Sequence, residues 1–185
     1  ANRFVLYDRL WHNSGIASNV TTVQTINSVA WPARDVNDTS NGAGVMIGLE
    51  TISSTGGGTP TQVVVTYTNS NNVSGRTAVN SYAMAANVTS GAFWPLTLAP
   101  GDVGVKSIQS FQLLGSGWSS GGAVSLSAYR PICWLDQLVT TGILDPFTGG
   151  LPRVANGAVL ALLGTGWTSS TGPGAPYGAL TFVQG

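Results

Sequence analysis

The residues that could carry out acid–base chemistry are few in this sequence. They comprise one histidine and seven carboxylates: His12, Asp8, Asp35, Asp38, Glu50, Asp102, Asp136 and Asp145. General acid–base catalysis needs a positioned histidine or a suitably placed pair of carboxylates. The search for chemistry therefore reduces to two short segments near the N-terminus in which such groups lie close together.

The first segment is the run D-R-L-W-H-N-S-G over residues 8–15, which gathers Asp8, His12 and Ser14, the side-chain types of a hydrolytic triad. No nucleophile elbow or second catalytic segment accompanies them, and groups this close along one chain rarely converge in the required geometry. We expect His12 to be a packed or rim residue. A single histidine also gives no credible zinc site. The sequence predicts no catalytic residue and no enzyme activity.

The second segment is A-R-D-V-N-D-T-S-N-G, which contains Asp35 and Asp38. Its composition favours turns held by side-chain to backbone hydrogen bonds, so we interpret both carboxylates as structural. The alternative is a calcium site that would add Asn37 and Asn41. Calcium takes six or more oxygen ligands, and this loop supplies few, so no metal or other cofactor is predicted. Cys133, the only cysteine, lies in an apolar run and is expected to be a buried, inert thiol.

The scarcity of charge is the main feature of the composition. Charged residues make up 8% of the 185 residues and the formal net charge is +0, against about 25% charged residues in typical soluble domains. The cations are scattered, so we expect no nucleic-acid partner and no membrane surface. No apolar run is long enough to span a bilayer, and a start at Ala1 fits removal of an initiator methionine or processing of a precursor. A neutral surface suits permanent assembly.

Short runs rich in β-branched and aromatic residues recur between clusters of Gly, Ser, Asn and Pro, which is typical of strands and turns. The expected strands are 3–7, 20–26, 43–52, 61–68, 92–98, 105–114, 122–130, 132–139, 158–163 and 177–183. They predict an all-β fold, an antiparallel, jelly-roll-like β-sandwich. We expect a core domain over 1–136 and a C-terminal strand or hairpin extension over 137–185, packed on the same domain or on a neighbour. The tetrapeptide A-P-G-D (99–102) predicts a type II turn.

One motif occurs twice, as L-L-G-S-G-W-S-S (113–120) and L-L-G-T-G-W-T-S (162–169). We interpret both copies as hairpins with Trp118 and Trp167 near the tips. Either these rings contact another chain, or each folds back over its own sheet. With Trp11 they form the candidate interface residues, because tryptophan offers large rigid contact area.

A carbohydrate- or receptor-binding β-sandwich, as in a tail fibre or a secreted lectin-like module, is the alternative function, since sugars stack on aromatic platforms. Trp31, Trp94 and Trp134 lie beside proline or within apolar runs, which indicates core or strand-edge packing. The loops that carry Trp118 and Trp167 lack the carboxylates that sugar sites usually contain.

An ordered set of segments resembles small virion structural proteins of tailed bacteriophages, nearest to capsid decoration, or cement, proteins. The set comprises L-Y-D-R-L-W-H-N-S-G-I, V-T-T-V-Q-T-I-N, T-Y-T-N followed by S-G-R-T-A, P-L-T-L-A-P-G-D-V-G-V-K-S-I-Q-S, and A-Y-R-P-I. The resemblance covers residues 3 to 135, and the segment from 137 onward is an addition to it.

The resemblance implies a β-rich subunit, made in the host cytoplasm, that binds the outer surface of a phage capsid. It implies as partners the major capsid protein and further copies of the chain, as a dimer or trimer. A tail, neck or fibre subunit would share much of this composition, and those locations stay open.

Overall fold

The computed structural model describes residues 2–13, 15–119, 122–137 and 152–165. These residues form ten strands, and every pairing between them is antiparallel. The strands are β1 (Asn2–His12), β2 (Ile16–Ala17), β3 (Gln24–Thr25), β4 (Met46–Thr51), β5 (Gln62–Asn69), β6 (Arg76–Asn80), β7 (Phe93–Thr97), β8 (Val105–Leu114), β9 (Ala123–Gln137) and β10 (Leu160–Thr165). The predicted all-β, antiparallel fold is confirmed.

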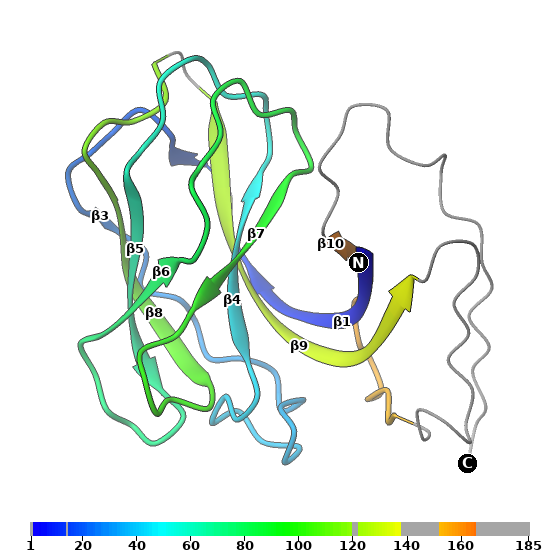
Figure 1. Cartoon of the computed structure of the whole chain (residues 1–185). Coiled ribbons are helices and arrows are strands. Elements are labelled where there is room, and N and C mark those ends of the chain that lie inside the picture. The colour runs from blue at the N-terminus through cyan, green and yellow to red at the C-terminus, as the bar shows by residue number, and fades with distance from the viewer. Residues whose placement is uncertain (1, 14, 120–121, 138–151, 166–185) are drawn as a thin grey trace.

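The strands follow one another in the order β10-β1-β9-β4-β7-β6-β5-β8-β3, and β2 pairs with β9. The path folds over at β7, whose first half pairs with β4 and whose last residues pair with β6. The strands β9 and β4 therefore face β5 and β8 across a shared core (Figure 1). This arrangement is consistent with the expected β-sandwich, and the jelly-roll pattern stays a prediction.

The core forms because apolar residues alternate along strands that have one face toward it. Along β5 every second residue is buried, beginning with Val63 and Val65, while the residues between them are half-exposed. Facing residues such as Leu49 of β4 and Leu126 of β9 are equally buried. Each such side chain contributes about 1.5–3 kcal/mol when it leaves water, so this interior is the main source of stability.

Several strand predictions were wrong in detail. The expected strand 20–26 is present only as β3, and the expected strand 177–183 lies outside the described residues. The expected strands 122–130 and 132–139 are one strand, β9, which runs through Pro131. The pairing with β1 shifts register beside Pro131, and a bulge of this kind accommodates a proline that cannot donate a ladder hydrogen bond. The strand β6 was not predicted, because in R-T-A-V-N only Ala78 is fully buried and the run lacks apolar alternation.

The predicted turn at A-P-G-D is confirmed. Gly101 has φ +85°, the positive value that the second central position of a type II turn requires. The N–H of Asp102 donates to the carbonyl of Ala99 over 3.1 Å, which closes the turn.

The prediction that 113–120 forms a hairpin was wrong. β8 pairs with β5 and β3, whereas β9 pairs with β1, β2 and β4, so this segment crosses between the layers. Trp118 does not stand at an exposed tip: it is completely buried, and its indole N–H donates to the carbonyl of Ala85 over 2.8 Å. Of the two alternatives for this ring, contact with another chain or packing within its own domain, the structure shows the second. Trp118 is therefore unavailable for contact with another chain. Trp167 lies outside the described residues.

Candidate functional site: an arm and a cleft

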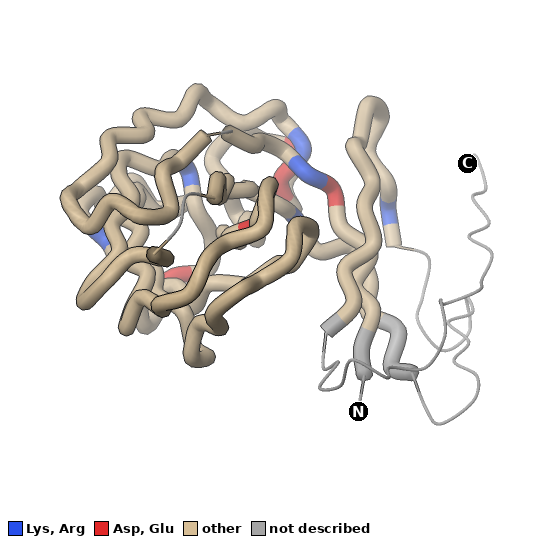
Figure 2. Tube along the Cα trace, turned by 90° about the horizontal axis from the view of Figure 1, so that it is seen from above, with Lys and Arg blue, Asp and Glu red and all other residues tan. Residues whose placement is uncertain are grey.

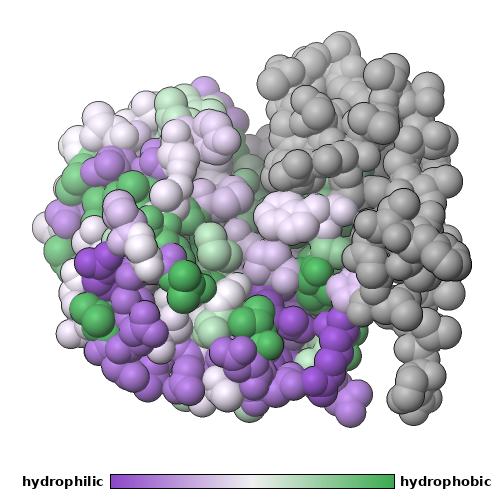
Figure 3. All heavy atoms as spheres, turned by 60° about the horizontal axis from the view of Figure 1, so that its bottom comes forward, coloured by the Kyte–Doolittle hydropathy of each residue, from purple (hydrophilic) through white to green (hydrophobic). Residues whose placement is uncertain are grey.

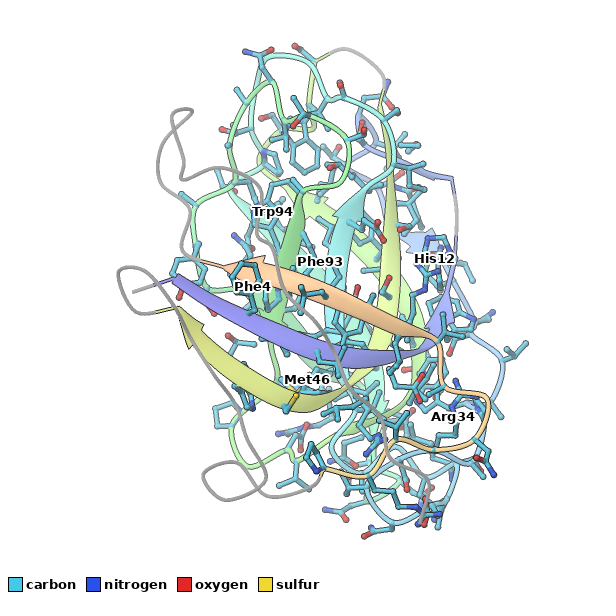
Figure 4. The ribbon with its side chains drawn as sticks, turned by 90° about the vertical axis from the view of Figure 1, so that its right-hand side faces the viewer. Phe4, His12, Arg34, Met46, Phe93 and Trp94 are labelled. Atoms are coloured by element: carbon cyan, nitrogen blue, oxygen red, sulfur yellow. The ribbon has the colours of Figure 1, made fainter. Side chains whose placement is uncertain are left out.

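Three strand segments project from the sandwich. They are residues 2–8 of β1, residues 131–137 of β9, and β10, and together they are called the arm below. Figure 1 shows the arm beside the sandwich, and Figure 4 shows β1 and β10 crossing in front of the sandwich strands. β9 belongs to both parts, because its first half pairs with β4. The described part of the predicted extension, residues 152–165, thus joins the sheet by pairing β10 with β1.

An apolar cleft of about 360 Å³ lies between the arm and the sandwich. Its lining comes from both sides: Val5, Pro131, Trp134 and Leu163 from the arm, and Gly44, Met46, Pro95 and Tyr129 from the sandwich. The phenol of Tyr129 is the most polar side-chain group in this lining. Burial raises the pKa of that phenol, so it stays neutral at physiological pH. The described lining of the cleft is therefore suited to burying apolar groups.

Three aromatic rings connect the arm to the sandwich. Tyr7 of β1 lies 6.0 Å from Phe93 and 5.2 Å from Tyr129, and the last two rings are 5.4 Å apart, all between centroids. Phe93 covers Gly48, where an added Cβ would lie 2.0 Å from the Phe93 ring. Glycine at position 48 therefore leaves the space that the end of the Phe93 ring occupies.

A buried ion pair also holds the base of the arm. The carboxylate of Asp8 accepts hydrogen bonds from Nε of Arg34 over 2.8 Å and from Nη2 over 3.1 Å. It accepts a third from the N–H of Val159 over 2.8 Å. Charged positions are few along the chain, and a group of both signs lies where the arm leaves the sandwich (Figure 2). Asp8 thus ties together β1, the loop before β4 and the segment that leads into β10.

Within the described residues, Asp8 and His12 of the segment 8–15 do not hydrogen-bond to each other. The oxygens of Asp8 are occupied by Arg34 and Val159, and His12 is an exposed residue (Figure 4). Partial burial, together with nearby Arg9, lowers the pKa of His12. Ser14 lies outside the described residues. His12 is a rim residue as expected.

The loop that contains Asp35 is held by that carboxylate, as predicted. Five groups donate to its two oxygens over 2.7–3.1 Å: the N–H groups of Asn37, Thr39, Gly42 and Ala43 and the Thr39 hydroxyl. Burial alone would raise the pKa of Asp35, but these hydrogen bonds outweigh it and lower the pKa. The donors occupy the lone pairs that a calcium ion would need, so the turn interpretation of Asp35 is confirmed.

Asp102, in the turn before β8, is a third structural carboxylate. It accepts hydrogen bonds from the Tyr67 hydroxyl over 2.6 Å, from Nδ2 of Asn69 over 2.7 Å and from Nε of Arg76 over 2.8 Å. The bond from Arg76 and then the bond from Tyr67 lower the pKa of Asp102 to about 2. The cluster links β5, β6 and the turn, and sequence patterns gave no sign of it because its members are far apart along the chain.

The lowered pKa of Asp102 predicts a loss of stability in acid. The unfolded state takes up a proton near the ordinary pKa of 3.8, and the folded state only near pH 2. The contribution is therefore complete above pH 3.8 and is lost as the pH falls to about 2. Urea midpoints measured across this range should fall more steeply for the wild type than for Asp102→Asn, with Tyr67→Phe between them. Parallel curves for the three proteins would contradict this role.

The remaining candidate residues have different environments. Trp11 is half-buried against the core, with its ring 5.6 Å from that of Trp31, and its role as an interface residue stays a prediction. Trp31 is buried, as expected from its position beside proline. Trp134, on the arm, instead exposes 53% of its surface. Cys133 is half-buried on the arm, less than expected, and burial raises the pKa of its thiol.

The surface of the described residues lacks large uniform patches in the view of Figure 3, where apolar side chains form small groups among hydrophilic ones. Within the described ranges, no three His, Cys, Asp or Glu side chains lie together as a metal site would require. A helix long and apolar enough to cross a bilayer is likewise not found in that part of the chain. Comparisons with protein-family models, with curated proteins and with solved structures found no significant match.

Proposed function

We propose that this chain is a non-enzymatic structural subunit of a bacteriophage virion that decorates and stabilises the capsid. The observation that carries the proposal is the arm, a three-stranded projection with an apolar cleft at its base. An arm of this kind can reach across a boundary between neighbouring subunits. The proposal that the assembly is a viral shell rests on the ordered segments of the sequence that resemble decoration proteins.

The environments of the carboxylates support a structural role. Asp8, Asp35 and Asp102 each accept several hydrogen bonds from protein groups, which occupy lone pairs that a substrate would otherwise contact. Each one instead holds a loop or turn against a strand. Three of the seven carboxylates of this chain thus fix its own architecture.

The partners in this proposal are the major capsid protein and further copies of the chain. Many copies on one shell act multivalently, so modest contacts at each site add up to a durable clamp. Contacts made by hydroxyl, amide and apolar groups depend little on ionic strength, because they do not rest on long-range charge attraction. The carbohydrate-binding alternative loses Trp118 as a platform for stacking a sugar, since this ring is buried.

The decoration role predicts a high copy number on the capsid. Quantitative mass spectrometry of purified particles should find this chain in amounts within about tenfold of the major capsid protein, since binding recurs on every equivalent site of a symmetric shell. Cryo-electron microscopy should place it on the outer surface. Its absence from particles would reject a virion role, and a few copies at one vertex would assign it to the neck or tail.

A further inference from the structure

The outer edge of β10 has no strand beside it among the described residues. β10 pairs with β1 on its other side, beginning with Asp8 opposite Leu160 and continuing without a register shift. Next to this pair, the N–H of Arg9 donates to the carbonyl of Val159 over 2.9 Å. Hydrogen-bonded and non-hydrogen-bonded pairs alternate in an antiparallel ladder, so this contact sets the phase for all of β10.

The phase determines which backbone groups of β10 are directed outward. Since Val159 faces β1, the residues at 161 and 163 also bond to β1, and those at 160, 162 and 164 direct their N–H and C=O groups away from it. No described residue is hydrogen-bonded to the outward groups of Leu160, Leu162 or Gly164. Such a row, repeating at every second residue, matches the spacing of an extended strand.

The opposite end of the sheet order is protected against such pairing. There β3 has only two residues, and the side chain of Gln24 both accepts from and donates to the backbone of Ala17, over 3.1 and 3.0 Å. Asn27 follows with φ +46°, which takes the chain out of extended geometry. Within the described part of the chain, β10 has no comparable protection, since L-A-L-L-G-T contains no charge, no proline and no bulge against β1.

The side chains beside this edge are apolar and accessible. Leu162 exposes 55% of its surface and Val159 exposes 48%. Leu163, on the other face of β10, lines the cleft. A strand added here would cover Leu162 with one set of its side chains and extend the wall of the cleft with the alternate set. A charged side chain placed over Leu162 would lose water without gaining a partner, so the edge favours an uncharged strand.

We propose that β10 receives an extended, uncharged strand from a neighbouring shell protein, which joins the arm as its fourth strand. This inference rests on the proposed function and names the surface through which the subunit holds its neighbour. Main-chain hydrogen bonds to Leu160, Leu162 and Gly164 supply the affinity, and the cleft beside Leu163 selects among side chains.

The test uses a proline at the edge of the arm. Leu162→Pro removes an outward N–H that makes no bond to β1, a position at which edge strands tolerate proline. Leu162→Val is the matched control, because it keeps the N–H and an apolar side chain. Purified full-length proteins are added to purified shells that lack this chain, and bound copies are counted by quantitative mass spectrometry. Leu162→Pro should bind about tenfold more weakly or worse, and Leu162→Val close to the wild type.

Each outcome has a distinct meaning. Equal binding by wild type and Leu162→Pro overturns the strand-addition proposal and leaves the decoration role intact, whereas failure of the wild type to bind overturns both. Self-association of the free wild type that Leu162→Pro abolishes would assign the edge to a second copy of this chain. If Leu162→Pro fails to fold, hydrogen exchange of the wild type decides: amides of Leu162 and Gly164 should become protected on the shell, and unchanged exchange would overturn the proposal.

Discussion

Replacing Trp118 with alanine is expected to lower the free energy of unfolding by about 3–5 kcal/mol. The indole is completely buried, and its ring centroid lies 6.4 Å from that of Trp94. The backbone on either side allows little collapse into the space left behind. An added Cβ at Gly117 would lie 2.7 Å from Cα of Asn19, and the N–H of Trp118 donates to the carbonyl of Ser18 over 2.9 Å.

Two further variants separate the contributions to this loss. Trp118→Phe keeps much of the apolar contact but removes the donor to Ala85 and part of the ring volume, so it should cost about 1–3 kcal/mol, less than Trp118→Ala. Tyr82→Ala, at a ring that is 73% exposed, should change stability by no more than about 0.5 kcal/mol. Urea denaturation measures all three. A Trp118→Ala protein as stable as Tyr82→Ala would contradict the buried position of this ring and restore Trp118 as an interface candidate.

The features that could be predicted from the sequence are those set by neighbouring residues. The run of β-branched and aromatic residues over 61–68 predicted β5 almost to the residue, and Pro100-Gly101 predicted a turn that is present. Both depend only on neighbours along the chain. The path of the chain around Trp118 does not depend on neighbouring residues alone, because the same Gly-rich motif can form a hairpin or a crossover between layers. Pairing partners far away in the sequence decide which one forms.

The arm was only partly predictable for a related reason. Pro131 divides β9 into two apparent strands in the sequence, although the structure passes through it with a bulge. L-A-L-L reads equally as a buried or an edge strand, since its composition does not reveal whether another strand lies beside it. The ion pair between Asp8 and Arg34 joins residues in different segments. Composition gave one general hint, that a carboxylate in so apolar a chain needs a partner if it is buried.

Breaking the ion pair between Asp8 and Arg34 is expected to cost about 3–5 kcal/mol, because the remaining charge stays buried without a partner. The two side chains are 0% and 15% exposed, respectively. Asp8→Ala also removes the acceptor for the N–H of Val159, the residue that precedes β10. Beyond the global loss of stability, hydrogen exchange should therefore show faster opening of β10 than of β5 in this variant.

A double-mutant cycle distinguishes the pair from its surroundings. Asp8→Ala and Arg34→Ala should each be strongly destabilising, while the double variant should be less so than their sum, since no unpaired charge remains. The exposed pair between Arg153 and Asp38, with side chains 75% and 51% exposed, provides the matched control. Its disruption by Arg153→Ala should cost no more than about 1 kcal/mol. If the losses of stability from Asp8→Ala and Arg34→Ala simply add in the double variant, the arm is held mainly by the aromatic contacts of Tyr7 and Phe93. Faster hydrogen exchange of β10 should then be found in Tyr7→Ala instead.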